Sequence, residues 1–185
     1  MVAEPTKGML VQWYKKVLEK TIFRKNIFVD KYDGDLSIID KHINHILEFD
    51  KGKHITNRGG YHSNNITFGF EDLLKFIHNC FLKINLNVSL DNFWININKG
   101  THYNIPHIHG VEGIMSVVYY HKVCCENSPL VFSQLVPQIN FDEYTLVPEN
   151  QMLVFFDANI PHKVLPCGQE DHERISLAFN YRILT

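Results

Sequence analysis

Histidine is the residue type that stands out in this sequence, because it supplies 11 of the 185 residues. His107 and His109 lie two positions apart in the strand-like run HYNIPHIH, so both side chains project from one face and can bind the same metal ion. His162 begins another strand-like run further along the chain. Imidazole is the commonest ligand for transition metals in proteins. The spacing therefore predicts a metal site built from these three histidines.

An arginine follows the last of these histidines, in the alternating run ERISLAFN. Arg174 and Ser176 share one face of the predicted strand, while Ile175 and Leu177 point to the other face. A guanidinium on an inward face needs an anion, and its planar fork suits a carboxylate held by two hydrogen bonds. The pattern predicts a carboxylate receptor beside the metal site.

The elements that must position these residues follow from the spacing of apolar side chains. Apolar residues at helical spacing follow Asp35, which is placed as an N-cap, and the same spacing recurs later in the first half. The first half thus predicts helices over 8–19, 36–49 and 71–83, an edge strand over 21–29 and a loop over 50–65. From residue 85 onward, about eight short alternating runs separated by Gly, Pro and Asn turns predict strands.

This order of elements predicts a mainly β protein with flanking helices, with a double-stranded β-helix fold, the jelly roll shared with cupins. We expect a single domain over residues 1–185. In it, residues 1–84 supply a helical buttress and edge strands, and residues 85–185 form the β-helix core that carries the metal site.

Composition and charge exclude several classes of function. A net charge of -2 provides no positive field to hold a nucleic-acid backbone. No apolar run approaches the roughly 20 residues that cross a bilayer, and Met1–Lys7 lacks the features of a secretion signal. The four cysteines show no CxxC spacing and are predicted to be reduced thiols. We expect a cytoplasmic protein that binds a small-molecule or peptide substrate and no membrane or nucleic acid, in an oligomeric state that stays open.

Taken together, the motifs resemble those of the 2-oxoglutarate and Fe(II)-dependent dioxygenase superfamily, in which His-x-Asp/Glu is followed by a distant His and then by Arg-x-Ser. Here they read His107-Ile108-His109, His162 and Arg174-Ile175-Ser176. The chain is also similar to an oxygenase group of phages and bacteria, in which a Trp-bearing strand leads through Asn-x-x-His-x-His to a Ser-containing strand ending in Tyr-Tyr. The residues that match this pattern are Trp94, Asn104, Ser116 and Tyr119-Tyr120.

The resemblance implies a site for two cofactors, Fe(II) and 2-oxoglutarate. Fe(II) would be held by His107, His109 and His162, and the far carboxylate of 2-oxoglutarate would meet Arg174, Ser176 and Tyr119. Tyr120 is expected on the opposite strand face. Such an enzyme would hydroxylate a substrate and release succinate and carbon dioxide. The resemblance does not imply which substrate is oxidised.

One departure concerns His109, which stands where the superfamily usually has a carboxylate. Glu112 and Asp157 are acidic residues that could also bind the metal or lie next to its ligands. Three histidines and a water also satisfy catalytic zinc. Three other functions therefore stay open: a three-histidine, cupin-like metalloenzyme that does not use 2-oxoglutarate, a zinc hydrolase or lyase, and a non-catalytic jelly-roll binding module.

Overall fold

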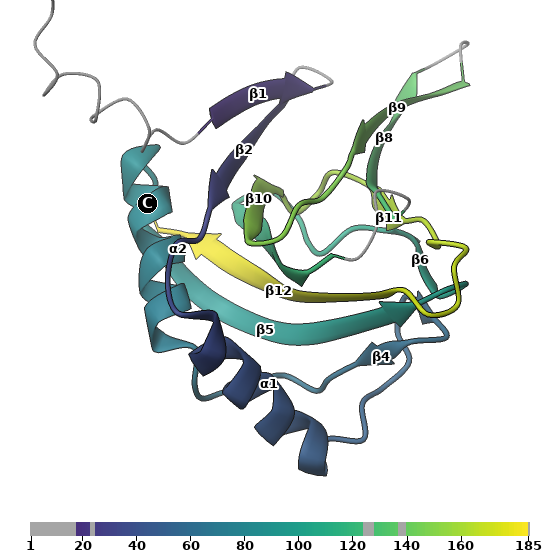
Figure 1. The fold of residues 1–185 in the computed structure, drawn as a ribbon. Helices are drawn as coiled ribbons and strands as arrows, with labels where there is room; N and C mark the ends of the chain where they lie inside the picture. Colours follow the sequence, from purple (N-terminus) through teal and green to yellow (C-terminus); the bar gives the residue numbers. More distant parts are fainter. Residues whose placement is uncertain (1–17, 23–24, 124–127, 137–139, 185) are drawn as a thin grey trace, which may run out of the picture.

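Two antiparallel β-sheets packed face to face form the body of the computed structural model (Figure 1), which describes residues 18–22, 25–123, 128–136 and 140–184. The elements in chain order are β1 (Leu18–Ile22), β2 (Lys25–Lys31), α1 (Leu36–Phe49), β3 (Asn57–Arg58), β4 (Tyr61–His62), α2 (Glu71–Lys83), β5 (Val88–Lys99), β6 (Tyr103–His107), β7 (Ile114–Lys122), β8 (Leu130–Val136), β9 (Asn140–Leu146), β10 (Met152–Asp157), β11 (His162–Val164) and β12 (Glu173–Ile183). The protein is thus mainly β with two helices in its described part, the jelly-roll fold that the sequence predicts.

The strand order shows how distant segments meet. The larger sheet runs β1-β2-β10-β7-β12-β5-β4, and the smaller sheet runs β3-β6-β11-β8-β9. Every pairing between described strands is antiparallel. In the smaller sheet β11 pairs with β6, and in the larger sheet β12 lies between β7 and β5. This topology brings the histidine-bearing segments and the arginine-bearing strand to the space between the sheets.

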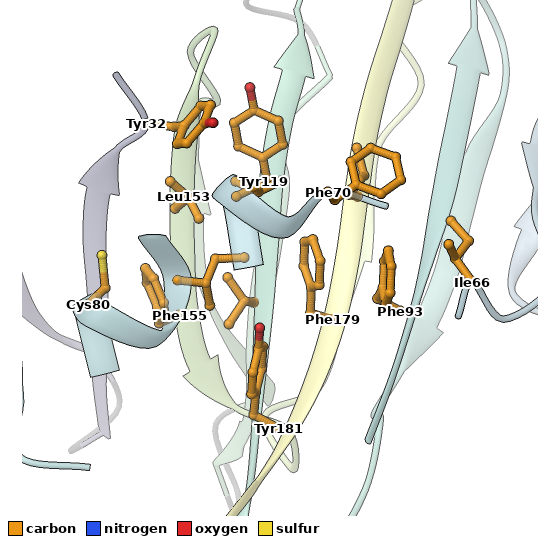
Figure 2. Packing of buried hydrophobic residues seen from close by; sticks show 14 of the residues in the cluster. Tyr32, Ile66, Phe70, Cys80, Phe93, Tyr119, Leu153, Phe155, Phe179 and Tyr181 are labelled. Carbon is orange, nitrogen blue, oxygen red and sulfur yellow. The ribbon is translucent and has the colours of Figure 1, made fainter. Parts of the chain in front are cut away.

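The two helices cover the outer face of the larger sheet (Figures 1 and 2). Asp35 caps α1 by accepting a hydrogen bond from the Ser37 backbone N–H at 2.8 Å, and α2 carries two acidic residues in its first turn. Ile39 and Ile43 of α1 and Leu73 and Ile77 of α2 are buried. A single cluster joins them to outward-facing sheet residues, so the helices shield this face from water.

A second apolar cluster fills part of the space between the sheets. Its members come mainly from β7, β8 and β10, with others from β1, β2 and β9, and include Tyr120, Phe132 and Phe156, all at most 1% exposed. Alternate residues of β7 therefore belong to different clusters: Val117 packs under the helices and Val118 faces the inter-sheet space. The centre of the larger sheet is thus buried on both faces, which explains the nearly continuous apolar sequences of β7 and β10.

Several sequence-based predictions of elements can be compared with the structure. The helices predicted over 36–49 and 71–83 are confirmed with those bounds. Of the helix predicted over 8–19, residues 8–17 lie outside the described residues, and the last two residues belong to the strand β1 instead. The edge strand predicted over 21–29 is replaced by the paired strands β1 and β2. The loop predicted over 50–65 contains β3 and β4, joined through Gly59 and Gly60, which both have positive φ angles.

The cysteine prediction is only partly right. Cys80 is a free, buried thiol, but the structure records Cys167 in a disulfide, so the prediction of reduced thiols is wrong for Cys167. The cytoplasmic location, which rested partly on those thiols, stays a prediction. In the described part of the chain, neither helix has the length and apolar character needed to span a membrane.

Candidate metal and cosubstrate site

The three predicted metal ligands meet at one end of the space between the sheets. His107 ends β6 and His162 begins β11, and these two residues are directly paired across the two strands. His109 lies in the loop after β6, where its backbone N–H donates to the Ala158 carbonyl oxygen at 2.9 Å. One nitrogen from each imidazole lies within 4.8 Å of the other two. Strand pairing and one loop hydrogen bond therefore assemble the cluster.

Two backbone carbonyls orient His107 and His162. The Nδ1 atom of His107 lies 2.7 Å from the Ile105 carbonyl oxygen, and that of His162 lies 2.9 Å from the Ile160 carbonyl oxygen. A carbonyl oxygen only accepts hydrogen bonds, so each Nδ1 carries the hydrogen. The Nε2 lone pair of each ring is then free to bind a metal.

His109 is oriented by side chains instead of the backbone. Its Nδ1 lies 3.1 Å from the Asn180 amide oxygen and 3.0 Å from the Ser116 hydroxyl. The Asn180 amide nitrogen donates to the Asn92 amide oxygen at 3.0 Å, which fixes the Asn180 oxygen toward His109. Nδ1 of His109 is therefore the donor, and its Nε2 is left as a metal ligand.

The donor atoms fit a divalent metal ion. Nε2 of His107 and Nε2 of His109 are 3.0 Å apart. Two nitrogens about 2.1 Å from one ion and at right angles to each other would be about 3.0 Å apart. Burial lowers the pKa values of all three histidines, that of His109 to about 4 and that of His162 well below its ordinary value. The cluster therefore presents neutral imidazoles, the form that binds metals.

A cavity of about 480 Å³ opens beside the three histidines. Its walls come from both sheets and from the segment before β3. Arg174 and Ser176 line one part, together with Leu130 and Val164 of the smaller sheet, and Trp94 and His62 line another. The volume is that of a small-molecule site, and its walls combine apolar surface with many polar side chains.

The predicted carboxylate receptor lies in this cavity. Arg174 is only 4% exposed, and its Nη1 donates to the Ser128 carbonyl oxygen at 3.0 Å and to the Ser128 hydroxyl at 3.2 Å. With the Asn98 amide turned so that its oxygen faces the guanidinium, Arg174 Nη2 also donates to that oxygen at 3.1 Å. These contacts hold a buried positive charge in a fixed position, which suits recognition of an anion.

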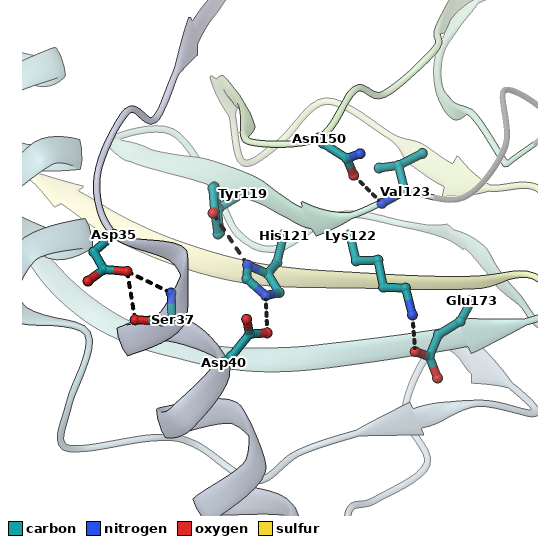
Figure 3. Close-up of polar contacts among 9 residues, drawn as sticks. All are labelled: Asp35, Ser37, Asp40, Tyr119, His121, Lys122, Val123, Asn150 and Glu173. Atoms are coloured by element: carbon teal, nitrogen blue, oxygen red, sulfur yellow. Dashed lines mark hydrogen bonds and ion pairs between the residues drawn. The ribbon is translucent and has the colours of Figure 1, made fainter.

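The prediction that Tyr119 faces the cosubstrate is wrong, because Tyr119 points to the opposite side of β7. It packs in the cluster beneath the helices, and its hydroxyl lies 3.5 Å from Nδ1 of His121, whose Nε2 contacts Asp40 at 2.7 Å (Figures 2 and 3). Tyr120 lines the cavity instead. The reason is strand register: Tyr120 pairs with Ser176 across β7 and β12, and directly opposite residues share a face.

Tyr120 has the features expected of the hydroxyl that the sequence analysis assigned to Tyr119. Its ring centroid lies 5.9 Å from the Arg174 guanidinium carbon, and its hydroxyl oxygen is buried with no hydrogen-bond partner in the described structure. Burial raises the pKa of this hydroxyl to about 12, so it stays protonated and can donate. A buried hydroxyl without a partner is costly, and a ligand carboxylate next to Arg174 would satisfy it.

The other candidate residues lie apart from the metal cluster. Glu112 is exposed, and Asp157 forms an ion pair with Lys25 at 2.9 Å, so among the described residues neither joins the three histidines. The Asn104 amide donates to the Thr56 hydroxyl at 3.1 Å and ties β6 to the preceding loop.

Sequence reasoning assigned no role in the site to four residues that build it. They are His62, which is 5% exposed, Trp94, Asn180 and the cavity-lining Tyr120. The alternation of polar residues in the β5 run NFWININ could have indicated that Trp94 shares a face with Asn92 and Asn96. No local signal in the sequence marks His62, because its burial comes from pairing of the two-residue strand β4 with β5.

A jelly roll with three converging imidazoles and a buried arginine in one cavity defines a class of metal-dependent enzyme. A comparison with protein families matches residues 92–180 to the family described as "Putative 2OG-Fe(II) oxygenase". The matched residues contain His107, His109, His162 and Arg174. This match covers just under half of the chain and supports an oxygenase that uses Fe(II) and 2-oxoglutarate as cofactors. No curated protein sequence matches it.

Solved structures share the fold at low sequence identity. A prolyl-4-hydroxylase from Pseudomonas putida is 16% identical, with a TM-score of 0.61 over 86% of this chain and 93% of that one. A viral collagen prolyl hydroxylase from Paramecium Bursaria Chlorella virus-1, in complex with 2-oxoglutarate, is 14% identical with a TM-score of 0.54 over 83% and 96%. HygX from Streptomyces hygroscopicus, with nickel and 2-oxoglutarate bound, is 8% identical with a TM-score of 0.58 over 97% and 87%.

Proposed function

We propose that the protein couples the oxidative decarboxylation of 2-oxoglutarate to the hydroxylation of a substrate C–H bond in the cavity beside the three histidines. One atom of O2 would enter succinate, the other would enter the hydroxylated product, and carbon dioxide would leave. The observation that carries the proposal is the placement of three Nε2 lone pairs and a buried guanidinium in one cavity of about 480 Å³.

The proposal gives each site residue a role. His107, His109 and His162 hold Fe(II) through Nε2, and iron bound there supplies the redox chemistry that activates O2. Arg174 binds the far carboxylate of 2-oxoglutarate, with Ser176 and Tyr120 as hydroxyl donors; Tyr120 takes the place that the sequence assigned to Tyr119.

The surroundings of these residues contribute orientation and exclusion of water. Leu130 and Val164 of the smaller sheet and Val118 and Ala178 of the larger sheet line the same cavity as the histidines and Arg174. Apolar walls of this kind suit the methylene groups of a keto acid whose two ends are both charged. A dry cavity also strengthens the attraction between Arg174 and a carboxylate.

Anaerobic titration of the Fe(II)-loaded protein with 2-oxoglutarate tests the proposal. Bidentate chelation of iron by a keto acid gives a visible metal-to-ligand charge-transfer band, which should grow and saturate. Arg174→Ala should bind iron with the wild-type stoichiometry but require at least about tenfold more 2-oxoglutarate, because a hydrogen-bonded charge partner is lost. Retained iron shows that the variant is folded.

The same titration separates the alternatives. Iron binding without a charge-transfer band would contradict the use of 2-oxoglutarate and favour a three-histidine metalloenzyme of another kind. Absence of metal binding in the wild type would contradict an enzyme of either kind and favour a binding module. Equal 2-oxoglutarate affinity in the wild type and Arg174→Ala would contradict the role of Arg174 alone.

A further inference from the structure

An aromatic surface extends from the metal cluster along a part of the cavity that the roles above do not use. The rings of His62 and Trp94 are stacked, with centroids 5.3 Å apart and planes inclined by 6°. The Trp94 ring in turn lies 5.3 Å from the His109 ring, at 62°. Both His62 and Trp94 line the cavity. The partly exposed Trp94 indole therefore lies next to a metal ligand, where a substrate must lie to react.

His62 presents a hydrogen-bond acceptor at this surface. Its Nδ1 lies 2.7 Å from the Ser63 carbonyl oxygen, so Nδ1 carries the hydrogen and donates it. Nε2 is then an acceptor, and within the described structure it has no hydrogen-bond partner. Burial lowers the pKa of His62, which keeps the ring neutral. His62 can therefore receive a hydrogen bond from a molecule in the cavity.

A second acceptor lies beside His62 on the neighbouring strand. Asn96 of β5 is paired directly with His62 of β4, so both side chains project from the same face of the sheet. The Asn96 amide oxygen is buried and has no hydrogen-bond partner in the described structure. Buried polar atoms in proteins are nearly always partnered, so exceptions in a cavity wall indicate a missing donor.

The charges around this surface disfavour a cationic donor. Lys53 lines the same part of the cavity, and its charge adds to the burial that lowers the pKa of His62. The acidic residue nearby in the lining, Asp91, is already paired with Arg182 at 3.0 Å. An ammonium or guanidinium group would therefore meet a lysine without a free carboxylate to balance it.

We propose that Trp94, His62 and Asn96 form the substrate-binding wall of this oxygenase, and that they select a flat ring carrying a neutral N–H or O–H donor. The ring lies against the Trp94 indole, and its donor binds His62 Nε2, with the Asn96 amide as a second acceptor. This inference rests on the proposed function, because it places the oxidised C–H bond beside His109.

Selectivity follows from the acceptors more than from the aromatic surface. Stacking on tryptophan tolerates many rings, because every flat ring has a π-face. A buried acceptor left without a donor costs free energy, so a site built around one rejects analogues whose donor is blocked. Methylation of the ring donor changes the size of the molecule only slightly, but it should weaken binding strongly.

Trp94 fluorescence provides a direct binding measurement, since the chain has two tryptophans and Trp13→Phe leaves Trp94 as the sole reporter. The protein is loaded anaerobically with Fe(II) and 2-oxoglutarate, and the charge-transfer band is recorded in the same sample. The probes are two pairs: uracil with 1,3-dimethyluracil, and p-cresol with 4-methylanisole. The first pair tests a ring amide N–H of the nucleobase kind, and the second tests a phenol O–H of the tyrosine kind.

At least one donor-bearing probe should quench Trp94 saturably, with its methylated partner binding about tenfold or more weakly. His62→Phe keeps an aromatic ring next to Trp94 but removes the acceptor, so it should abolish the difference within the pair. His62→Gln restores an acceptor oxygen and should recover part of it. His45→Phe, the same substitution at an exposed position of α1, should behave as the wild type.

Three results would overturn the inference. They are equal affinity for the members of both pairs in the unmodified background, retained discrimination in His62→Phe, and absence of saturable quenching by every probe. If any of these occurs while the charge-transfer band forms normally, the substrate-binding wall is wrong and the proposed function stands. If the band itself is absent, the proposed function fails first.

Discussion

At the scale of single residues, three oxygen atoms determine which nitrogen of each site histidine is left to bind the metal. The carbonyls of Ile105 and Ile160 take the Nδ1 hydrogens of His107 and His162, and the Asn180 amide takes that of His109. Two of these partners belong to the backbone and cannot be removed by substitution. The Asn180 contact belongs to a side chain, so it is the point at which metal affinity can be tested without altering a ligand.

Asn180→Ala should weaken Fe(II) binding by about 10- to 100-fold, because His109 loses the amide that fixes its tautomer and ring orientation. The matched control is Asn44→Ala, the same substitution at an exposed position of α1, which should leave the metal affinity unchanged. Metal affinity is measured by anaerobic competition with a coloured chelator. Wild-type affinity in Asn180→Ala would show that the Ser116 hydroxyl alone orients His109.

Two adjacent tyrosines provide an internal comparison for the cosubstrate site. Tyr120→Phe should weaken 2-oxoglutarate binding by about tenfold or more, the usual effect of losing a hydrogen bond to a charged group. Tyr119→Phe, on the opposite face of β7, should leave the 2-oxoglutarate affinity unchanged. The charge-transfer titration measures both. A larger loss in Tyr119→Phe than in Tyr120→Phe would contradict the assignment of faces.

At the scale of elements, the difference between helices and strands explains what the sequence could predict. The bounds of α1 and α2 follow from local signals, namely apolar spacing and the Asp35 cap, and they were predicted correctly. The face assignment on β7 failed because Ile114–Lys122 is buried on both sides, which removes the alternation that distinguishes inside from outside. The polar Ser116 shares a face with Tyr120, but the polar His121 shares a face with Tyr119, so the polar residues of β7 gave no consistent signal.

The attachment of α2 to the sheet can be tested on two neighbouring residues of the helix. Phe81 is fully buried, with its ring 5.2 Å from that of Phe155 and 5.0 Å from that of Tyr181, whereas Leu82 is 52% exposed. Phe81→Ala should lower the free energy of unfolding by about 3 to 5 kcal/mol, and Leu82→Ala should change it by about 0.5 kcal/mol or less. Denaturant unfolding measures both, and similar losses would contradict packing of this helix face on the sheet.

At the scale of the whole molecule, the two faces of the larger sheet serve different purposes. The outer face is closed by α1 and α2, in a cluster that draws on residues both before and after position 85. On the inner face, a smaller apolar cluster fills one part of the space between the sheets, and the cavity occupies another part. Part of the interior is thus left for ligands, so binding of iron and 2-oxoglutarate should add stability that the polypeptide alone does not have.

Thermal unfolding with and without ligands measures that added stability. Fe(II) at about 100 times its dissociation constant should stabilise the fold by about 2.7 kcal/mol, which corresponds to roughly 5 to 11 °C in Tm for a chain of this size. Because 2-oxoglutarate is proposed to chelate the metal, it should raise Tm further when iron is present and much less in metal-free protein. Arg174→Ala should keep the increment from iron and lose most of that from 2-oxoglutarate. An equal effect of 2-oxoglutarate with and without iron would contradict chelation, because the cosubstrate would then bind through the arginine end of the cavity alone.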